Sequence, residues 1–223
     1  YYTLSGERQV LAGTYTATAT LNNPPGITNC TWPDGSTSNL SITYTIGAKI
    51  VDRPTVKENL SYTGSEQSGI NETSSTLYDL TDTLSAINAG EYIATAVLKD
   101  SANYVWRGES IGKESIEIRW TIASKKVAPL EIASSSFVYD GSEKFISISS
   151  IGWGEYTEIS GSTNATEVGK YSFRAILKNP SASARNFVWQ DGTSNDIIFE
   201  WEILPYPVEP PVAIENLKYT GTP

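Results

Sequence analysis

The segment Asn88-Ala-Gly-Glu-Tyr92-Ile-Ala-Thr-Ala-Val-Leu98 contains the pattern that decides the fold. Tyr92, two alanines and Leu98 occupy alternate positions, so that one face carries a large residue, two small ones and a second large one. An apolar period of two is typical of a half-buried β-strand, whereas an amphipathic helix has a period near 3.6. The alanines leave room for an opposing aromatic ring, and Trp106 and Trp120 are natural candidates for it.

The same segment occurs two more times in the chain. Its counterparts are Leu11-Ala-Gly-Thr-Tyr15-Thr-Ala-Thr-Ala-Thr-Leu21 and Glu167-Val-Gly-Lys-Tyr171-Ser-Phe-Arg-Ala-Ile-Leu177, and the three tyrosines are 77 and 79 residues apart. Three further landmarks recur in a constant order at nearly the same period. The first is an Asn-x-x-Trp segment, at Asn29–Trp32, Asn103–Trp106 and Asn186–Trp189. The second is a closing alternating strand, at Ile42–Ile46, Ile118–Ile122 and Phe199–Ile203. The third is a Tyr-x-Gly opening, at Tyr62–Gly64, Tyr139–Gly141 and Tyr219–Gly221.

This periodicity predicts how the chain is divided. We expect whole units at 47–125 and 126–205, the back half of a unit at 1–46 and the opening of another at 206–223. Short joints that contain proline lie at the expected boundaries. Because proline fixes φ and removes a donor, such joints favour a semi-extended connection between units.

The fold class follows from the strands within each unit. Ile116–Ile122 alternates strictly between apolar and polar residues, and Leu40–Ile46 and Ile197–Ile203 share its phase, with Ile198 as an extra apolar residue on the outer side. The Gly-x-Tyr sequence at the start of the tyrosine strand is similar to the tyrosine corner of immunoglobulin-like sandwiches. We predict an all-β chain of tandem immunoglobulin-like β-sandwiches of about 77–80 residues each, without any helix.

The aromatic landmarks are the predicted structural core, because they recur at the inward positions of the strands. These residues are Tyr15, Tyr92, Tyr171, Trp32, Trp106, Trp189, Tyr44, Trp120 and Trp201.

Composition excludes several classes of chemistry. The sequence has no His and one Cys, Cys30, so it cannot form a Ser-His-Asp triad, a His- or thiolate-ligated zinc site or a disulfide within the chain. The 16 Lys and Arg against 25 Asp and Glu give a net charge of −9, which disfavours contact with nucleic acid and anionic membranes. We therefore expect a protein that is not an enzyme, has no cofactor or metal, binds no nucleic acid and does not insert into a membrane.

The recurring motifs together resemble the MBG-type (YGX-type) bacterial immunoglobulin-like repeat domains. The resemblance rests on the Tyr-x-Gly opening, the Ala-Gly-x-Tyr-x-Ala-x-Ala strand, the Asn-aromatic-x-Trp segment with its Asp-Gly turn and the closing Trp-x-Ile strand, and it covers essentially the whole chain. It implies tandem β-sandwich modules of extracellular proteins at the bacterial cell surface. The first unit departs from the motif at Cys30, where the others have Tyr104 and Phe187.

The sequences that most resemble a ligand-binding site are Trp32-Pro-Asp34-Gly and Trp189-Gln-Asp191-Gly. An aromatic platform beside a carboxylate could contact a sugar ring through Asp34 or Asp191. Asp-Gly is also a favoured sequence for a tight turn between strands, because glycine accepts a positive φ. The central unit, with Trp106-Arg-Gly108, keeps the glycine without the aspartate and favours the turn.

Three functions agree with these observations. The first is a structural spacer that projects or assembles surface structures, with neighbouring immunoglobulin-like repeats of the same or an identical chain as partners. The second is an adhesin module that binds a host glycan or protein. The third is a filament or surface-layer subunit, because half a sandwich exposes an apolar face and a strand edge that a second chain could complete by strand addition.

Overall fold

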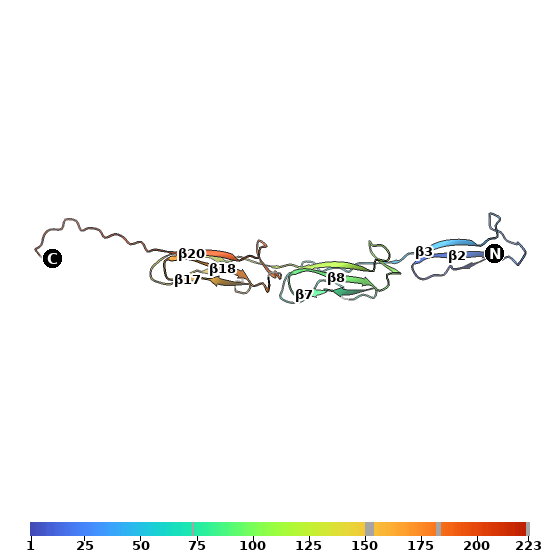
Figure 1. Ribbon diagram of the computed structural model, residues 1–223, viewed down its shortest axis with the longest axis horizontal. Helices are drawn as coiled ribbons and strands as arrows, with labels where there is room; N and C mark the ends of the chain where they lie inside the picture. The colour runs from blue at the N-terminus through green and yellow to red at the C-terminus, as the bar shows by residue number, and fades with distance from the viewer. Residues whose placement is uncertain (73, 150–153, 182–183, 222–223) are drawn as a thin grey trace. The chain divides into compact units, whose positions relative to one another are not determined.

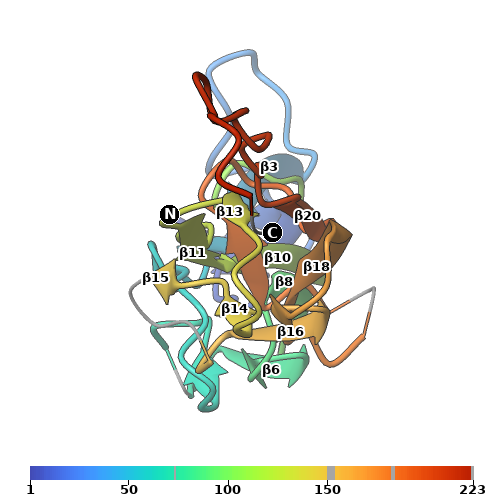
Figure 2. The same cartoon turned by 90° about the vertical axis from the view of Figure 1, so that its left-hand side faces the viewer.

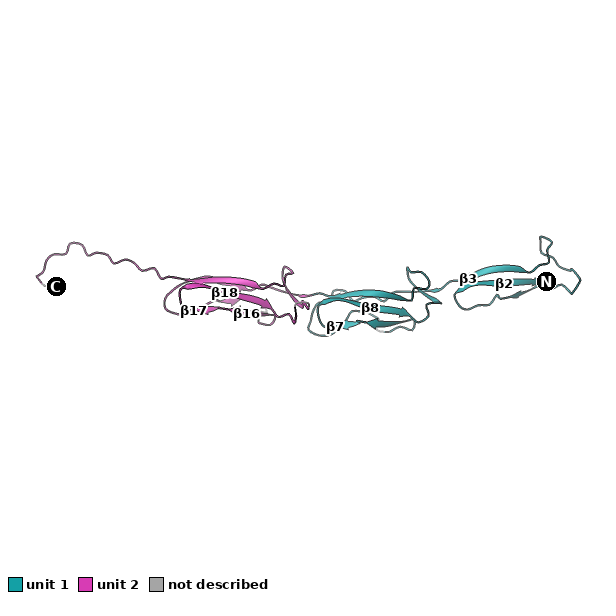
Figure 3. Cartoon of the chain, viewed as in Figure 1, with its two compact units in different colours: residues 1–123 teal, residues 124–223 magenta. Residues whose placement is uncertain are grey.

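The computed structural model describes residues 1–72, 74–149, 154–181 and 184–221. Regular structure in these residues consists of twenty β-strands, with no helix, and the prediction of an all-β chain is confirmed. The chain forms two compact units, residues 1–123 and residues 124–223 (Figure 3). The first unit combines the expected half-unit 1–46 with nearly all of the expected unit 47–125; the finer division into four segments stays a prediction.

The first 46 residues form a three-stranded antiparallel sheet with the order β1-β2-β3 (Figure 1). Its strands are β1 (Tyr2–Ser5), β2 (Gly13–Leu21) and β3 (Leu40–Ile46). Ala17 and Ala19 of the central strand are buried, but Leu40 and Ile42 of β3 are exposed, although a half-buried strand was expected there. The reason is that none of the buried clusters in the described residues lies over this sheet.

The remainder of the first unit has a second antiparallel sheet with the order β10-β8-β6. Two short pairs accompany it: β4 with β9, which is parallel, and β5 with β7, which is antiparallel. The bounds of these strands are β4 (Lys49–Val51), β5 (Gln67–Ser68), β6 (Tyr78–Asp82), β7 (Ser85–Ala86), β8 (Gly90–Leu98), β9 (Tyr104–Trp106) and β10 (Ser115–Ile122).

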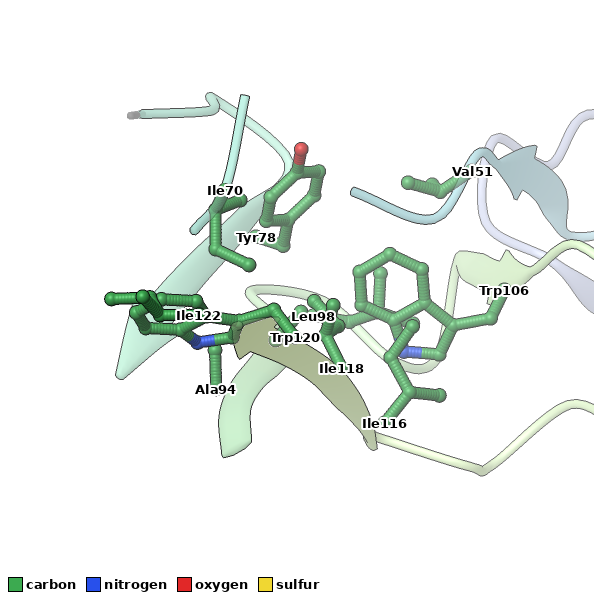
Figure 4. Packing of buried hydrophobic residues seen from close by; sticks show 11 residues of the cluster. Val51, Ile70, Tyr78, Ala94, Leu98, Trp106, Ile116, Ile118, Trp120 and Ile122 are labelled. Carbon is green, nitrogen blue, oxygen red and sulfur yellow. The ribbon is translucent and has the colours of Figure 1, made fainter. Parts of the chain in front are cut away.

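One buried cluster joins these strands into a core. The alternating burial of β10 confirms the predicted phase, because all its apolar residues are buried and its polar residues are exposed. Figure 4 shows the Trp106 indole between Val51 and Ile116, and the Trp120 indole beside Ala94. Gly69 lies against the same Trp120 ring, so closely that a Cβ at this position would overlap it. Gly69 and Ala94 therefore leave room for the Trp120 indole in the core.

The second unit contains a four-stranded sheet with the order β13-β20-β18-β16 (Figure 2). Three short pairs accompany it: β11 with β19, which is parallel, and β12 with β15 and β14 with β17, which are antiparallel. The bounds are β11 (Lys125–Val127), β12 (Glu131–Ile132), β13 (Ser136–Val138), β14 (Lys144–Phe145), β15 (Ile148–Ser149), β16 (Thr157–Gly161), β17 (Asn164–Ala165), β18 (Gly169–Leu177), β19 (Phe187–Trp189) and β20 (Ile197–Leu204).

The interior of this unit consists of two buried clusters. One surrounds Trp189 with Val127 and Ala175, and the other surrounds Trp201 with Phe173. Ile198 is exposed on the outer face of β20, as its position in the alternating sequence predicted.

The long strands pair in one constant register in three places. The repeated tyrosine stands opposite the aromatic residue of the closing strand, and the glycine two residues earlier stands opposite that strand's last isoleucine. The tyrosine pairs are Tyr15 with Tyr44, Tyr92 with Trp120 and Tyr171 with Trp201. Residues 205–221, which follow the last of these strands, form no strand.

Candidate functional site

Each repeated tyrosine binds the backbone four residues before it. Its hydroxyl donates to a carbonyl oxygen, over 3.0 Å from Tyr15 to Leu11, 2.7 Å from Tyr92 to Asn88 and 2.7 Å from Tyr171 to Glu167. Two of these rings stack on their register partners, with centroids 4.7 Å apart for Tyr92 and Trp120 and for Tyr171 and Trp201. The Tyr15 and Tyr44 rings lie 5.7 Å apart and are tilted by 35°. Each of the three tyrosines thus attaches the loop that precedes its long strand to the sheet.

The tryptophans of the described residues use their indole nitrogens within the protein. Trp106, Trp120, Trp189 and Trp201 are buried. The other members of the predicted core set are half-buried: Trp32, Tyr15, Tyr44, Tyr92 and Tyr171. Every indole donates a hydrogen bond to a backbone carbonyl: Trp32 to Ser38, Trp106 to Glu114, Trp120 to Thr83, Trp189 to Asn195 and Trp201 to Ser162. These rings are satisfied structural residues, and Trp32 alone among them offers part of its surface to solvent.

The sequences after Trp32 and Trp189 form tight turns. The amide of Gly35 donates to the Trp32 carbonyl over 2.9 Å, and the amide of Gly192 donates to the Trp189 carbonyl over 2.8 Å. Gly35 and Gly192 have φ values of 82° and 89°, in the left-handed region that favours glycine. Gly108 after Trp106 has the same conformation, with φ at 82°. The Asp-Gly sequence therefore meets the backbone requirement of a turn.

The two candidate ligand residues are used within these turns. Asp34 Oδ1 accepts from the Ser36 amide over 2.9 Å, and Asp191 Oδ1 accepts from the amide and the hydroxyl of Thr193, each over 2.8 Å. The backbone N–H of Ser36 lowers the pKa of Asp34, and the backbone N–H of Thr193 lowers that of Asp191. Such bonds favour the ionised carboxylate. A contact of either aspartate with a sugar stays a prediction.

The sequence analysis did not predict an Asn or Asp side chain that holds the backbone of each Asn-x-x-Trp segment by hydrogen bonds; we call it the clasp. The side chain of Asn179 accepts from the Phe187 amide over 2.8 Å and donates to the Phe187 carbonyl over 2.9 Å. Asn23 makes the same two bonds with the amide and the carbonyl of Cys30, each over 2.8 Å. Asp100, at the corresponding position, accepts from the Asn103 amide. The signal was an Asn or Asp two residues after the last leucine of each tyrosine strand.

Trp32, the one half-buried indole of the described residues, lies near the exposed ring of Tyr2. The Tyr2 and Trp32 rings lie 6.1 Å apart and are tilted by 48°, and Tyr2 is exposed. Cys30, two residues before Trp32, is half-buried. An aromatic pair with free surface can stack on an apolar or planar partner.

The described residues contain neither a metal-binding cluster nor a membrane-spanning helix. No group of three or more His, Cys, Asp or Glu residues there has the proximity needed to hold a metal ion. No helix of sufficient length and apolar character to cross a membrane is found there. Comparison with known proteins adds no relative: no family model matches the chain, and neither curated proteins nor solved structures show significant similarity to it.

Proposed function

We propose that this chain is a non-enzymatic structural spacer, built from tandem immunoglobulin-like β-sandwich modules of an extracellular bacterial surface protein. The constant register of the tyrosine and closing strands at three places supports a repeated module. The tyrosine hydroxyl bonds support the likeness to a tyrosine corner. The sequence motifs of MBG-type repeats support the assignment to a bacterial surface.

The single observation that carries this proposal is the use of the aromatic landmarks for stability. Four of the indoles are buried, and each donates its N–H to a backbone carbonyl. Buried aromatic rings contribute large apolar area to a core, and their hydrogen bonds fix where they lie. A protein whose recurring aromatic residues stabilise its core is suited to bear mechanical load and to keep neighbouring modules at a fixed spacing.

Pulling on single molecules tests the spacer function. We expect two separate unfolding events, each lengthening the chain by about 25 nm, because a unit of roughly 77 residues extends at ~3.6 Å per residue less its folded length. Chains that extend without two such events would contradict a spacer made of two mechanically resistant modules.

Binding of a glycan is a second candidate, favoured by the exposed Tyr2 ring beside the half-buried Trp32 ring. A glycan array with the intact chain tests it, together with the variants Trp32→Ala and Tyr2→Ala. An adhesin would show a specific glycan signal that both variants lose. No signal, or a signal that survives both substitutions, would reject this site.

A further inference from the structure

The sheet of residues 1–46 has an apolar face that its counterpart in residues 47–123 buries. Tyr2 of β1 stands opposite the last leucine of β2, as Tyr78 of β6 does in the β8 pair, but Tyr2 is 54% exposed and Tyr78 only 7%. Ile42 and Ile118 likewise stand opposite equivalent alanines, yet they are 50% and 8% exposed. The same positions therefore differ only in whether something covers them.

Within residues 47–123, the segment before β5 supplies part of that cover, through Val51, Val56 and Leu60. Lys49–Val51 runs parallel to β9, with Val51 beside Trp106, and the Lys49 amide donates to the Asn103 carbonyl over 2.8 Å. Farther along, Tyr62 donates its amide to the Ala123 carbonyl over 2.9 Å, and Ala123 donates to the Leu60 carbonyl over 2.8 Å. One segment thus pairs with β9 near its start and with Ala123, the residue after β10, near its end.

Residues 205–221 repeat this covering segment in sequence and in local backbone. Glu215-Asn-Leu-Lys-Tyr-Thr-Gly221 matches Glu58-Asn-Leu-Ser-Tyr-Thr-Gly64 at six of seven positions, and Val208 precedes it by the same spacing as Val51. Asn216 has φ at 61° and Asn59 at 58°, an uncommon conformation for a residue other than glycine. Val208 is 82% exposed where Val51 is 3% exposed.

We propose that residues 205–221 of one chain add as a strand to the open face of residues 1–46 of a second copy. This pairing rests on the proposed function, in which residues 1–46 and 205–221 are parts of modules equivalent to residues 47–125. By that equivalence, Tyr206 lies beside Cys30, Val208 beside Trp32, and Leu217 beside Ile46. The Tyr206 amide then donates to the Asn29 carbonyl, and the Gly47 amide donates to the Leu217 carbonyl.

The prolines of the two segments are informative about this pairing. Pro207 corresponds to Ile50, the middle residue of β4, whereas the backbone hydrogen bonds between β4 and the β9 segment use Lys49 and Val51. Successive amides of a strand point to opposite sides, so a proline at the middle position costs no bond of the ladder. Pro33, in contrast, replaces Arg107, whose amide donates to the Val51 carbonyl over 2.8 Å. This bond is lost at the proposed contact.

The added segment completes the module only in part. Residues 205–221 correspond to residues 48–64, a range that does not include β5 or the Gly69 that contacts the closing-strand ring. Together with the bond lost at Pro33, this predicts a reversible association that increases with protein concentration.

Sedimentation velocity of the intact chain over a range of concentrations tests the association. We expect species larger than a monomer at high concentration and their loss in Val208→Asp, because Val208 would be buried beside Trp32. Val212→Asp is the matched control: it adds the same charge to the same segment, but its counterpart Thr55 is exposed. A monomer at all concentrations, or equal effects of both substitutions, would overturn the proposal.

Cross-linking tests the register. Tyr206→Cys places a thiol beside the native Cys30, and mild oxidation should yield linear multimers on a non-reducing gel, reversed by reductant. Val212→Cys, distant from Cys30 in this register, should yield fewer. Equal cross-linking of the two variants, or a bridge formed only within one chain, would overturn the pairing. Either result would leave the spacer function intact, because that function is read from forced unfolding.

Discussion

Individual residues in this chain act chiefly by making room for or holding an aromatic ring. Tyr92 stacks on Trp120 at 4.7 Å between centroids and binds Asn88 through its hydroxyl. Gly69 contacts the same indole where no side chain would fit. The alternation of the sequence indicated the tyrosine and the tryptophan as core residues, but it did not indicate Gly69, because the glycine meets its ring only through tertiary packing.

Gly69→Ala should destabilise the first unit by about 1 to 3 kcal/mol, because the added methyl group overlaps the Trp120 ring and overpacking forces neighbouring side chains to shift. Urea unfolding measures the change. Gly47→Ala is the control, since a Cβ at Gly47 meets no atom within 4 Å. Equal stability of the two variants would show that Gly69 does not have this packing role.

Tyr92→Phe should cost about 0.5 to 1.5 kcal/mol, because it removes the 2.7 Å hydrogen bond to the Asn88 carbonyl and keeps the ring stacked. The midpoint of urea unfolding reports this loss. The tryptophan fluorescence of the folded chain, to which Trp120 and five other tryptophans contribute, should change little, since the stacking geometry persists. A midpoint equal to that of the native chain would mean that the corner bond contributes nothing to stability.

At the scale of elements, the turns and strands were predictable to different degrees. The Asp-Gly turns and the long alternating strands follow from local sequence, because φ preference and apolar period act over a few residues. The parallel pairs β4 with β9, β11 with β19 and β13 with β20 were not predicted. Their members are far apart in sequence and only three residues of each are paired, so no local pattern specifies the partner.

The turn after β19 should make the second unit sensitive to acid. The Thr193 N–H lowers the pKa of Asp191 below its ordinary value of 3.8, so the stabilisation is complete above about pH 4 and is lost as pH falls through the lowered pKa. Asp191→Asn keeps an oxygen acceptor that does not titrate, so the urea midpoint of this variant should fall less between about pH 4 and pH 2.

Glu158→Gln is the comparison for this pH series, because Glu158 is exposed on β16 and its removal changes the net charge equally. If Asp191→Asn and Glu158→Gln show the same acid profile, the turn hydrogen bonds do not link stability to pH.

The whole molecule distributes its core unevenly along the chain. Every residue of the buried cluster in the first unit lies between Val51 and Ile122, and the two clusters of the second unit lie between Val127 and Ile203. Residues 1–46 and 205–221 lie outside these clusters and expose much of their apolar surface. The two ends of the chain therefore have surface available for contacts that the interior segments have already made.

Residues 47–125 should fold alone as a monomer with a cooperative urea transition, because they contain the complete cluster around Trp106 and Trp120. Residues 1–46 alone should show no cooperative transition, because an uncovered sheet of about 40 residues buries too little surface. Far-UV circular dichroism during urea titration distinguishes the two. A fragment 47–125 without a cooperative transition would refute the assignment of an independent core.

The sequence by itself determined the all-β class, which residues of the long strands face inward, and the spacing at which the landmarks recur. Alternation and turn preference are properties of neighbouring residues, so they can be read without the tertiary structure. Tertiary structure alone decided the parallel pairings, the Asn179 clasp and the contact of Gly69 with Trp120. It also separated Trp32 from Trp106, two residues in equivalent sequence positions, of which one is half-buried and the other fully buried. Burial is set by what lies opposite a side chain, and in a β-protein that partner comes from a distant part of the chain.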